Sequence, residues 1–143
     1  MIVPDVNLLI HAYNVGSPVH DEARAWLEGL LSAPAPVGLP WVTTLGFIRI
    51  TTHPRIMEHP YPAEKACAHV ESWLAQPQVT LLHPGERHAS ILLDLLRRLG
   101  TAGNLTTDAH LAALAVEHQA ELHSTDVDFG RFPGLRWINP LAD

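Results

Sequence analysis

Four aspartates stand where carboxylates could act together on a metal ion. Asp5 ends the first predicted strand, and Asp126 and Asp128 follow a predicted strand at 121–125. Asp108 falls in the first turn of the predicted helix that precedes that strand. Mg²⁺ and similar hard cations take oxygen ligands, usually one or two carboxylates plus retained waters. The four side chains therefore form a candidate site for a divalent cation.

Most of these positions also have a purely structural interpretation. Asp108, near a helix start, is typical of a cap or of a partner for the helix dipole, and Asp126 and Asp128 could form a turn. Asp5 is harder to explain in this way because it stands among apolar residues, where a buried carboxylate is costly unless a cation or hydrogen-bond donors satisfy it. Asn7 could either cap the first helix or hydrogen-bond to the acids. The spacing alone leaves these alternatives open.

The elements that must position these residues can be predicted from apolar periodicity. The predicted strands are residues 1–5, 37–39, 79–82, 121–125 and 135–138. The predicted helices are 7–13, a helix from a Ser17-Pro18 cap to Ser32, 41–52, 62–74, 86–99, and a helix from Thr106 or Thr107 to His118. Because strands alternate with helices, we expect an α/β fold with three α/β/α layers, in which helices cover both faces of a mostly parallel central sheet. Ligands in such sheets bind at the carboxyl ends of the strands, where Asp5 and Asp126 fall.

The composition is typical of one soluble globular domain over residues 1–143. Hydrophobic residues make up 47% of the chain and charged residues 17%, and no repeat or linker divides it. No apolar stretch is long enough to span a membrane, and no basic segment precedes an apolar run as in a secretory signal. Cys67 is the only cysteine, so no internal disulfide can form. We therefore expect a cytoplasmic protein.

The charge balance limits how the chain could bind nucleic acid. Nine Lys and Arg against fifteen Asp and Glu give a net charge of −6, whereas non-specific phosphate binding favours the opposite sign. A polyanion must therefore be met by a local patch or by a metal. The ten histidines are scattered, with no H-x-x-x-H pair on a helix, so histidine-bound zinc is not indicated.

Three segments of the chain resemble PIN-domain proteins of the VapC toxin type. They read DVNLLIHAY at 5–13, LPWVTTLGFIRITTHPRI at 39–56, and GNLTTDAHLAALAVEHQAELHSTDVDFGRFPGLRWINP at 103–140. The last is the most specific, because an Asp opens a helix of the pattern T-D-A-x-L-A-A-L-A and S-T-D-x-D-F follows the next strand. The resemblance implies a PIN-like fold over the whole chain.

The resemblance also implies a role for each acid. Asp5 matches the first acid of the family, Asp108 the third and Asp126 the fourth, with Asp128 as its usual companion. Asn7 and Thr125 match the polar residues beside those acids. The sequence departs from the family at one place, because the family carries a Glu on the central helix where this chain has Gly46 or a neighbour in 43–48. No acid occurs between Glu28 and Glu58.

The function that the resemblance implies is that of a metal-dependent endoribonuclease, the toxin of a type II toxin–antitoxin pair. Asp5, Asp108 and Asp126 would bind Mg²⁺ or Mn²⁺, and the activated water would cleave structured RNA at its single-stranded elements. The expected contacts to RNA phosphates are Arg49, Arg97 and Arg131. The expected protein partners are a second copy of the chain, in a homodimer, and a VapB-type antitoxin that covers the site.

Two other classes of function are compatible with parts of the sequence. A non-catalytic RNA- or protein-binding module with the same fold is favoured by the absence of the central Glu. An aspartyl-phosphate receiver also places an Asp after a parallel strand beside Mg²⁺. That class needs a Lys late in the chain, and the only lysine here is Lys65.

Overall fold

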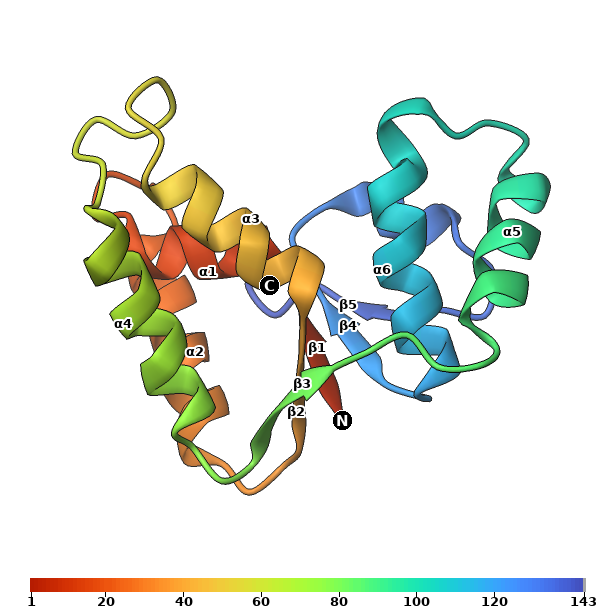
Figure 1. The fold of residues 1–143 in the computed structure, drawn as a ribbon, viewed down its shortest axis with the longest axis horizontal. Coiled ribbons are helices and arrows are strands. Elements are labelled where there is room, and N and C mark those ends of the chain that lie inside the picture. Colours follow the sequence, from red (N-terminus) through yellow and green to blue (C-terminus); the bar gives the residue numbers. More distant parts are fainter. Residues whose placement is uncertain (143) are drawn as a thin grey trace.

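Five parallel strands form the central sheet of the computed structural model, which describes residues 1–142 (Figure 1). The strands are β1 (Ile2–Pro4), β2 (Val37–Pro40), β3 (Val79–Leu82), β4 (Glu121–His123) and β5 (Arg136–Ile138). Their order across the sheet is β3-β2-β1-β4-β5, and every neighbouring pair is parallel. The prediction of a mostly parallel sheet is confirmed.

Helices cover both faces of this sheet (Figure 1). One side carries α1 (Val6–Tyr13), α2 (His20–Ser32), α3 (Trp41–Thr51) and α4 (Ala63–Leu74), and the other carries α5 (His88–Leu99) and α6 (Thr106–Glu117). Two short 3-10 helices, η1 (Gly103–Leu105) and η2 (Val127–Arg131), complete the described chain. The three predicted layers are therefore present. Among the residues described, no helix has the length and apolar character needed to cross a membrane.

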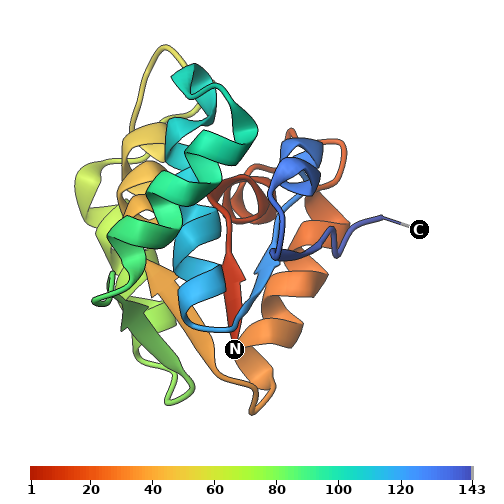
Figure 2. The same cartoon turned by 90° about the vertical axis from the view of Figure 1, so that its right-hand side faces the viewer.

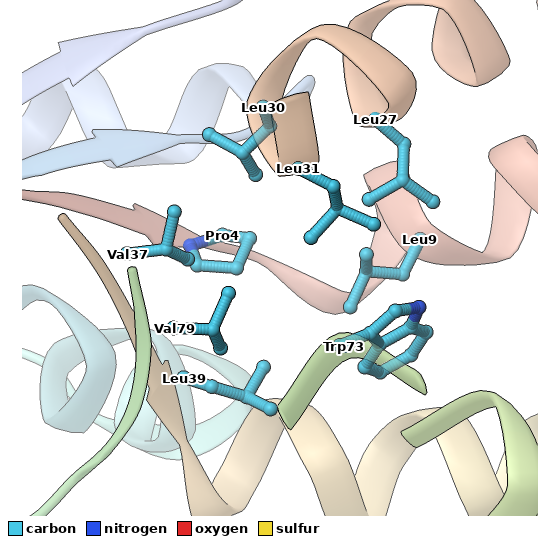
Figure 3. A pocket seen from close by; sticks show the side chains of 9 residues that line it. All are labelled: Pro4, Leu9, Leu27, Leu30, Leu31, Val37, Leu39, Trp73 and Val79. Atoms are coloured by element: carbon cyan, nitrogen blue, oxygen red, sulfur yellow. The ribbon is translucent and has the colours of Figure 1, made fainter. Parts of the chain in front are cut away.

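An apolar cluster fills the space on each side of the sheet. Val3, Leu114 and Leu122 belong to the cluster beneath α5 and α6, and all three are almost fully buried. Leu9 and Trp73 belong to the cluster beneath α1 to α4. Figure 3 shows side chains of this second cluster facing one another around a void of about 10 Å³. A gap so small, with an entirely apolar lining, is a packing gap in the core and is no ligand site.

Most element boundaries match the sequence prediction within one residue, and three ends differ by more. α2 begins at His20 rather than at Ser17-Pro18, because Ser17 Oγ accepts a hydrogen bond from Val19 N and holds a turn before the helix. The strand predicted at 121–125 ends at His123. α5 begins at His88 rather than at residue 86. The start of α6 at Thr106 matches the prediction, although the Thr106 hydroxyl bonds back to the carbonyl of Gly103 and does not cap the helix.

The strand order of the sheet reverses at its centre, between β1 and β4. The chain moves outward from β1 to β2 and β3, and then returns to the other side of β1 for β4 and β5. Figure 2 shows β1 and β4 side by side, and Ile2 pairs with Glu121 and Pro4 with His123. Because both strands end at the same edge of the sheet, Asp5 and the segment 124–128 are brought together at the position where open α/β sheets bind ligands.

Candidate functional site

Asp5 is fixed between β1 and β4 by hydrogen bonds at both carboxylate oxygens. It caps α1, with Oδ1 accepting from the backbone N–H of Val6 at 2.7 Å and Oδ2 accepting from Ser124 Oγ at 2.7 Å. Its own backbone N–H donates to the carbonyl of His123 at 2.9 Å. Burial raises the pKa of Asp5 and the charge of Asp126 raises it further, whereas the hydrogen bonds from Ser124 and Val6 lower it.

Ser124 is the centre of this hydrogen-bond network, although it was not among the site residues predicted from the sequence. Its side chain is fully buried, and Oγ accepts from Asn7 Nδ2 at 3.3 Å and from the backbone N–H of Asp126 at 3.0 Å while donating to Asp5. One donor hydrogen and two lone pairs are thus all used. The signal in the sequence was a polar residue in line with the buried Leu122, two positions earlier on the strand.

The two polar residues predicted beside the acids have different outcomes. Asn7 does contact the network through Nδ2, and the cap of α1 is Asp5 rather than Asn7. Thr125 does not hydrogen-bond to the acids, because within residues 1–142 its hydroxyl has no hydrogen-bond partner. Ser124, which lies in line with the buried Leu122, faces Asp5 instead.

Asp108, Asp126 and Asp128 bring three carboxylates together. One oxygen from each lies within 4.8 Å of the others, and all three residues are half-buried. Asp126 also forms the turn that was its structural alternative, since its Oδ1 accepts from the backbone N–H of Asp128 at 2.9 Å. The turn therefore places both carboxylates, so its formation is compatible with a metal-binding role for Asp126. Asp5 lies outside this triad of closest oxygens.

The pKa of Asp108 is strongly raised by its surroundings. Burial raises the pKa of Asp108 to about 6, with further contributions from the charges of Asp126, Asp5 and Asp128. Within the described residues no basic side chain forms an ion pair with any of the four acids. The four carboxylates are therefore close together without a neutralising partner from the chain.

The donor set fits a hard divalent cation. Carboxylate oxygens within 4.8 Å of one another match the ligands that Mg²⁺ and Mn²⁺ prefer. Asn7 Oδ1 is buried without a hydrogen-bond partner and adds an unused neutral oxygen beside the network. In the described part of the chain no histidine joins such a group; His88 and His110 bond each other at 2.9 Å between α5 and α6.

An open pocket of about 150 Å³ connects the acids to α3. Asp5, Asp108, Gly46 and Arg49 are among its lining residues. Of the three arginines predicted to contact RNA, Arg49 is therefore at the site, whereas Arg97 and Arg131 are exposed on α5 and η2 and do not line the pocket. The α3 wall contributes no acid, so the departure from the family pattern at Gly46 is also a feature of the site.

The chain is similar to known proteins over essentially its full length. The PIN domain family model matches residues 2–135. Ribonuclease VapC33 of Mycobacterium tuberculosis is 46% identical over 143 residues, which is 100% of both chains.

Two solved structures have the same fold at lower identity. VapBC2 from Rickettsia felis, bound to a DNA fragment from its promoter, is 17% identical with a TM-score of 0.69, covering 97% of this chain and 98% of that one. The Mycobacterium tuberculosis sarcin-ricin loop cleaving toxin VapC20 is 18% identical with a TM-score of 0.67, covering 95% of this chain and 99% of that one.

Proposed function

The chain belongs to the PIN-domain family and within it to the VapC ribonucleases, and from this premise we propose that it is a metal-dependent endoribonuclease acting as the toxin of a type II toxin–antitoxin pair. The observation that carries the proposal is the approach of the Asp108, Asp126 and Asp128 carboxylates to within 4.8 Å beside the fixed carboxylate of Asp5. Such a cluster has an evident use in holding a cation. The identity with VapC33 over the full chain supports RNA as the substrate.

Asp108, Asp126 and Asp128 would hold a Mg²⁺ or Mn²⁺ ion, and Asp5 is predicted to contribute directly or through a water. When bound, a divalent cation supplies a water of lowered pKa and offsets charge on the phosphate and the leaving oxygen. The carboxylates left free would accept hydrogen bonds from the attacking water and orient it. Ser124 keeps Asp5 in place throughout, because its hydroxyl donates to Asp5 Oδ2.

The acidity of the chain means that RNA must be attracted locally. With a net charge of −6, the cation and nearby arginines have to supply the attraction that the protein as a whole lacks. Arg49 lines the acid pocket, and Arg97 and Arg131 stay predicted contacts farther along the RNA. The substrate class is structured RNA, cut where bases are unpaired, since an A-form groove hides its base edges.

A VapB-type antitoxin and a second copy of the chain are the proposed protein partners. Exposed apolar side chains support at least one such interface: Trp41 on α3 and Leu93 on α5 are both 47% exposed. The proposed place of action is the cytoplasm, where RNA is available. Sedimentation of the purified chain, alone and with its antitoxin, measures both assemblies.

A second candidate function is RNA or protein binding without turnover. The observation that favours it is Gly46, which leaves the α3 wall of the pocket without a carboxylate. Such a protein would bind RNA in the absence and presence of divalent metal and produce no fragments. One assay therefore separates the two functions.

That assay is the cleavage of total cellular RNA by purified, antitoxin-free protein. We expect discrete fragments with Mg²⁺ or Mn²⁺ and none with EDTA. Asp108→Asn should abolish cleavage because it removes one ligand charge with little change in shape. Asp94→Asn is the matched control, since Asp94 lies exposed on α5 in an ion pair with Arg98 and outside the pocket. Intact RNA in every lane would favour the binding function, and equal activity of the two variants would refute the site.

A further inference from the structure

Gly46 opens the acid pocket toward the outer surface of α3. A trough of about 490 Å³ adjoins the pocket, and Val42, Gly46 and Arg49 line both. Leu45 and Ile48 form the rest of the trough. The two spaces therefore adjoin at a residue that has no side chain, and a ligand in the pocket could extend over α3.

The gap at Gly46 follows from the packing of α3 on α1. A Cβ built at Gly46 would lie 3.3 Å from Val6 Cγ2, which is closer than ordinary contact. Glycine is less favourable than alanine inside a helix, and the close packing of α3 on α1 offsets that cost. A larger side chain would need α3 to shift and would also narrow the passage between pocket and trough.

Arg49 presents an unneutralised positive charge at this passage. It lies three residues after Gly46, on the same face of α3, and its side chain is exposed. Although Asp5 and Asp108 line the same pocket, neither forms an ion pair with Arg49, and no other carboxylate in residues 1–142 does. A guanidinium held beside acids without pairing to them is available to an anion, and its planar donors match two oxygens of a phosphate.

Resting on the proposed function, we infer that Gly46 and Arg49 form an RNA subsite that continues the acid pocket. Arg49 binds a backbone phosphate of the nucleotide next to the cleaved bond, and the surface of Val42, Leu45 and Ile48 receives its base or ribose. Leu45 is 59% exposed, which leaves apolar area for such a contact. The volume of the trough is in the range of pockets that hold a molecule of nucleotide size.

The charge of Arg49 is complementary to the phosphate groups of an RNA strand. A phosphodiester is attracted both by Arg49 and by a cation held by the acids. The passage is thus complementary to an anionic strand running out of the metal site.

Binding of single-stranded RNA by variants made in the Asp108→Asn background tests the subsite. The Asp108→Asn change removes one negative charge from the pocket and prevents cleavage of the probe. The probe is a 12-nucleotide RNA of random sequence, and its binding is measured by fluorescence anisotropy from 50 to 200 mM KCl. Arg49→Gln should weaken binding about three- to tenfold and lower the salt slope by about 0.7, the value for one phosphate contact on a single strand. Arg49→Lys should keep the slope. Arg55→Gln, at an exposed arginine that does not line the pocket, should match its parent.

Two further measurements test whether the effect of Arg49→Gln on RNA binding arises where the pocket meets the trough. Without RNA, Arg49→Gln in the otherwise unchanged protein should bind Mn²⁺ about two- to threefold more tightly, because a positive charge leaves the pocket. Arg55→Gln should not. Leu45→Ala should weaken RNA binding about two- to threefold with an unchanged slope, and Val15→Ala, at another exposed apolar residue, should have no effect.

The outcomes distinguish the subsite from the proposed function. Equal affinity and slope for Arg49→Gln and Arg55→Gln, or no RNA binding at 50 mM KCl, would overturn the subsite even if the protein cleaves RNA. The trough would then be a surface for an apolar peptide. If Arg49→Gln weakens RNA binding as expected but the wild-type protein cleaves no RNA, the nuclease proposal is refuted and the RNA subsite stands.

Discussion

Four carboxylates lie close together without a basic partner, and the burial of Asp108, together with repulsion from the other three, makes the metal-free protein sensitive to pH. The pKa of Asp108 is raised from 3.8 to about 6, so the folded chain holds this proton more tightly than the unfolded chain does. The contribution of Asp108 therefore favours folding below about pH 4 and is lost as the pH rises through about 6.

Asp108→Asn should accordingly stabilise the metal-free protein at pH 7. We expect a gain of about 1 kcal/mol, or about 3 °C in Tm, since solvent screens part of the repulsion at a half-buried group. The gain should disappear near pH 4, where the carboxyl is already protonated. Thermal unfolding in EDTA at the two pH values measures it. Asp94→Asn should gain nothing, and an equal gain for Asp108→Asn at both pH values would contradict the assigned cause.

Ser124 connects Asp5, Asn7 and the backbone of Asp126 through a single hydroxyl. Ser124→Ala should destabilise the fold by about 1–3 kcal/mol, because it leaves buried polar groups without partners. It should also weaken Mn²⁺ binding, since Asp5 loses the donor that fixes Oδ2.

Thr125→Ala is the matched control for Ser124→Ala and should change the free energy of unfolding by less than about 0.5 kcal/mol. Urea unfolding and a Mn²⁺ titration of both variants make the comparison. A larger effect at Thr125 than at Ser124 would restore the assignment made from the sequence.

At the scale of the elements, periodicity predicted the helices and strands well, and local hydrogen bonding moved their ends. The strand β3 and the helix α4 lie where apolar spacing and the opening Pro62 placed them. The start of α2 could not be predicted, because the choice between a Ser17 cap and a Ser17 turn depends on the contact with Val19. Ser124 was missed for another reason, because only the structure shows that its hydroxyl, in line with the buried Leu122, bonds to Asp5.

The end of α5 at Leu99 was predicted from the sequence, and the conformation of the next residue, Gly100, makes the reason testable. Gly100 follows α5 with φ of 76°, the left-handed region that favours glycine. Gly100→Ala should destabilise the protein by about 1 kcal/mol. Gly29→Ala, at an exposed site in α2 with no atom within 4 Å of the new Cβ, should stabilise it by about 0.5–1 kcal/mol. The same sign for both changes, measured by thermal unfolding, would contradict this explanation.

At the scale of the whole molecule, the order β3-β2-β1-β4-β5 determines where the acids meet. Acids far apart in the sequence could be predicted as neighbours because parallel strands end at one edge of the sheet. The sequence could not say which oxygens come closest, and the structure places Asp128 rather than Asp5 in the closest triad. The sequence also could not show which of the three arginines lines the pocket. Only Arg49 does so, because of how α3 packs on α1.

The most direct test of the metal centre is anomalous diffraction from crystals of the protein grown or soaked with Mn²⁺. We predict an anomalous peak bounded by the carboxylates of Asp108, Asp126 and Asp128, with the Asp5 carboxylate still bonded to Ser124. The same crystals of Asp108→Asn should lose the peak. A peak elsewhere in the molecule, or a pocket that stays empty at millimolar Mn²⁺ and pH 7.5, would contradict a metal-dependent nuclease at this site.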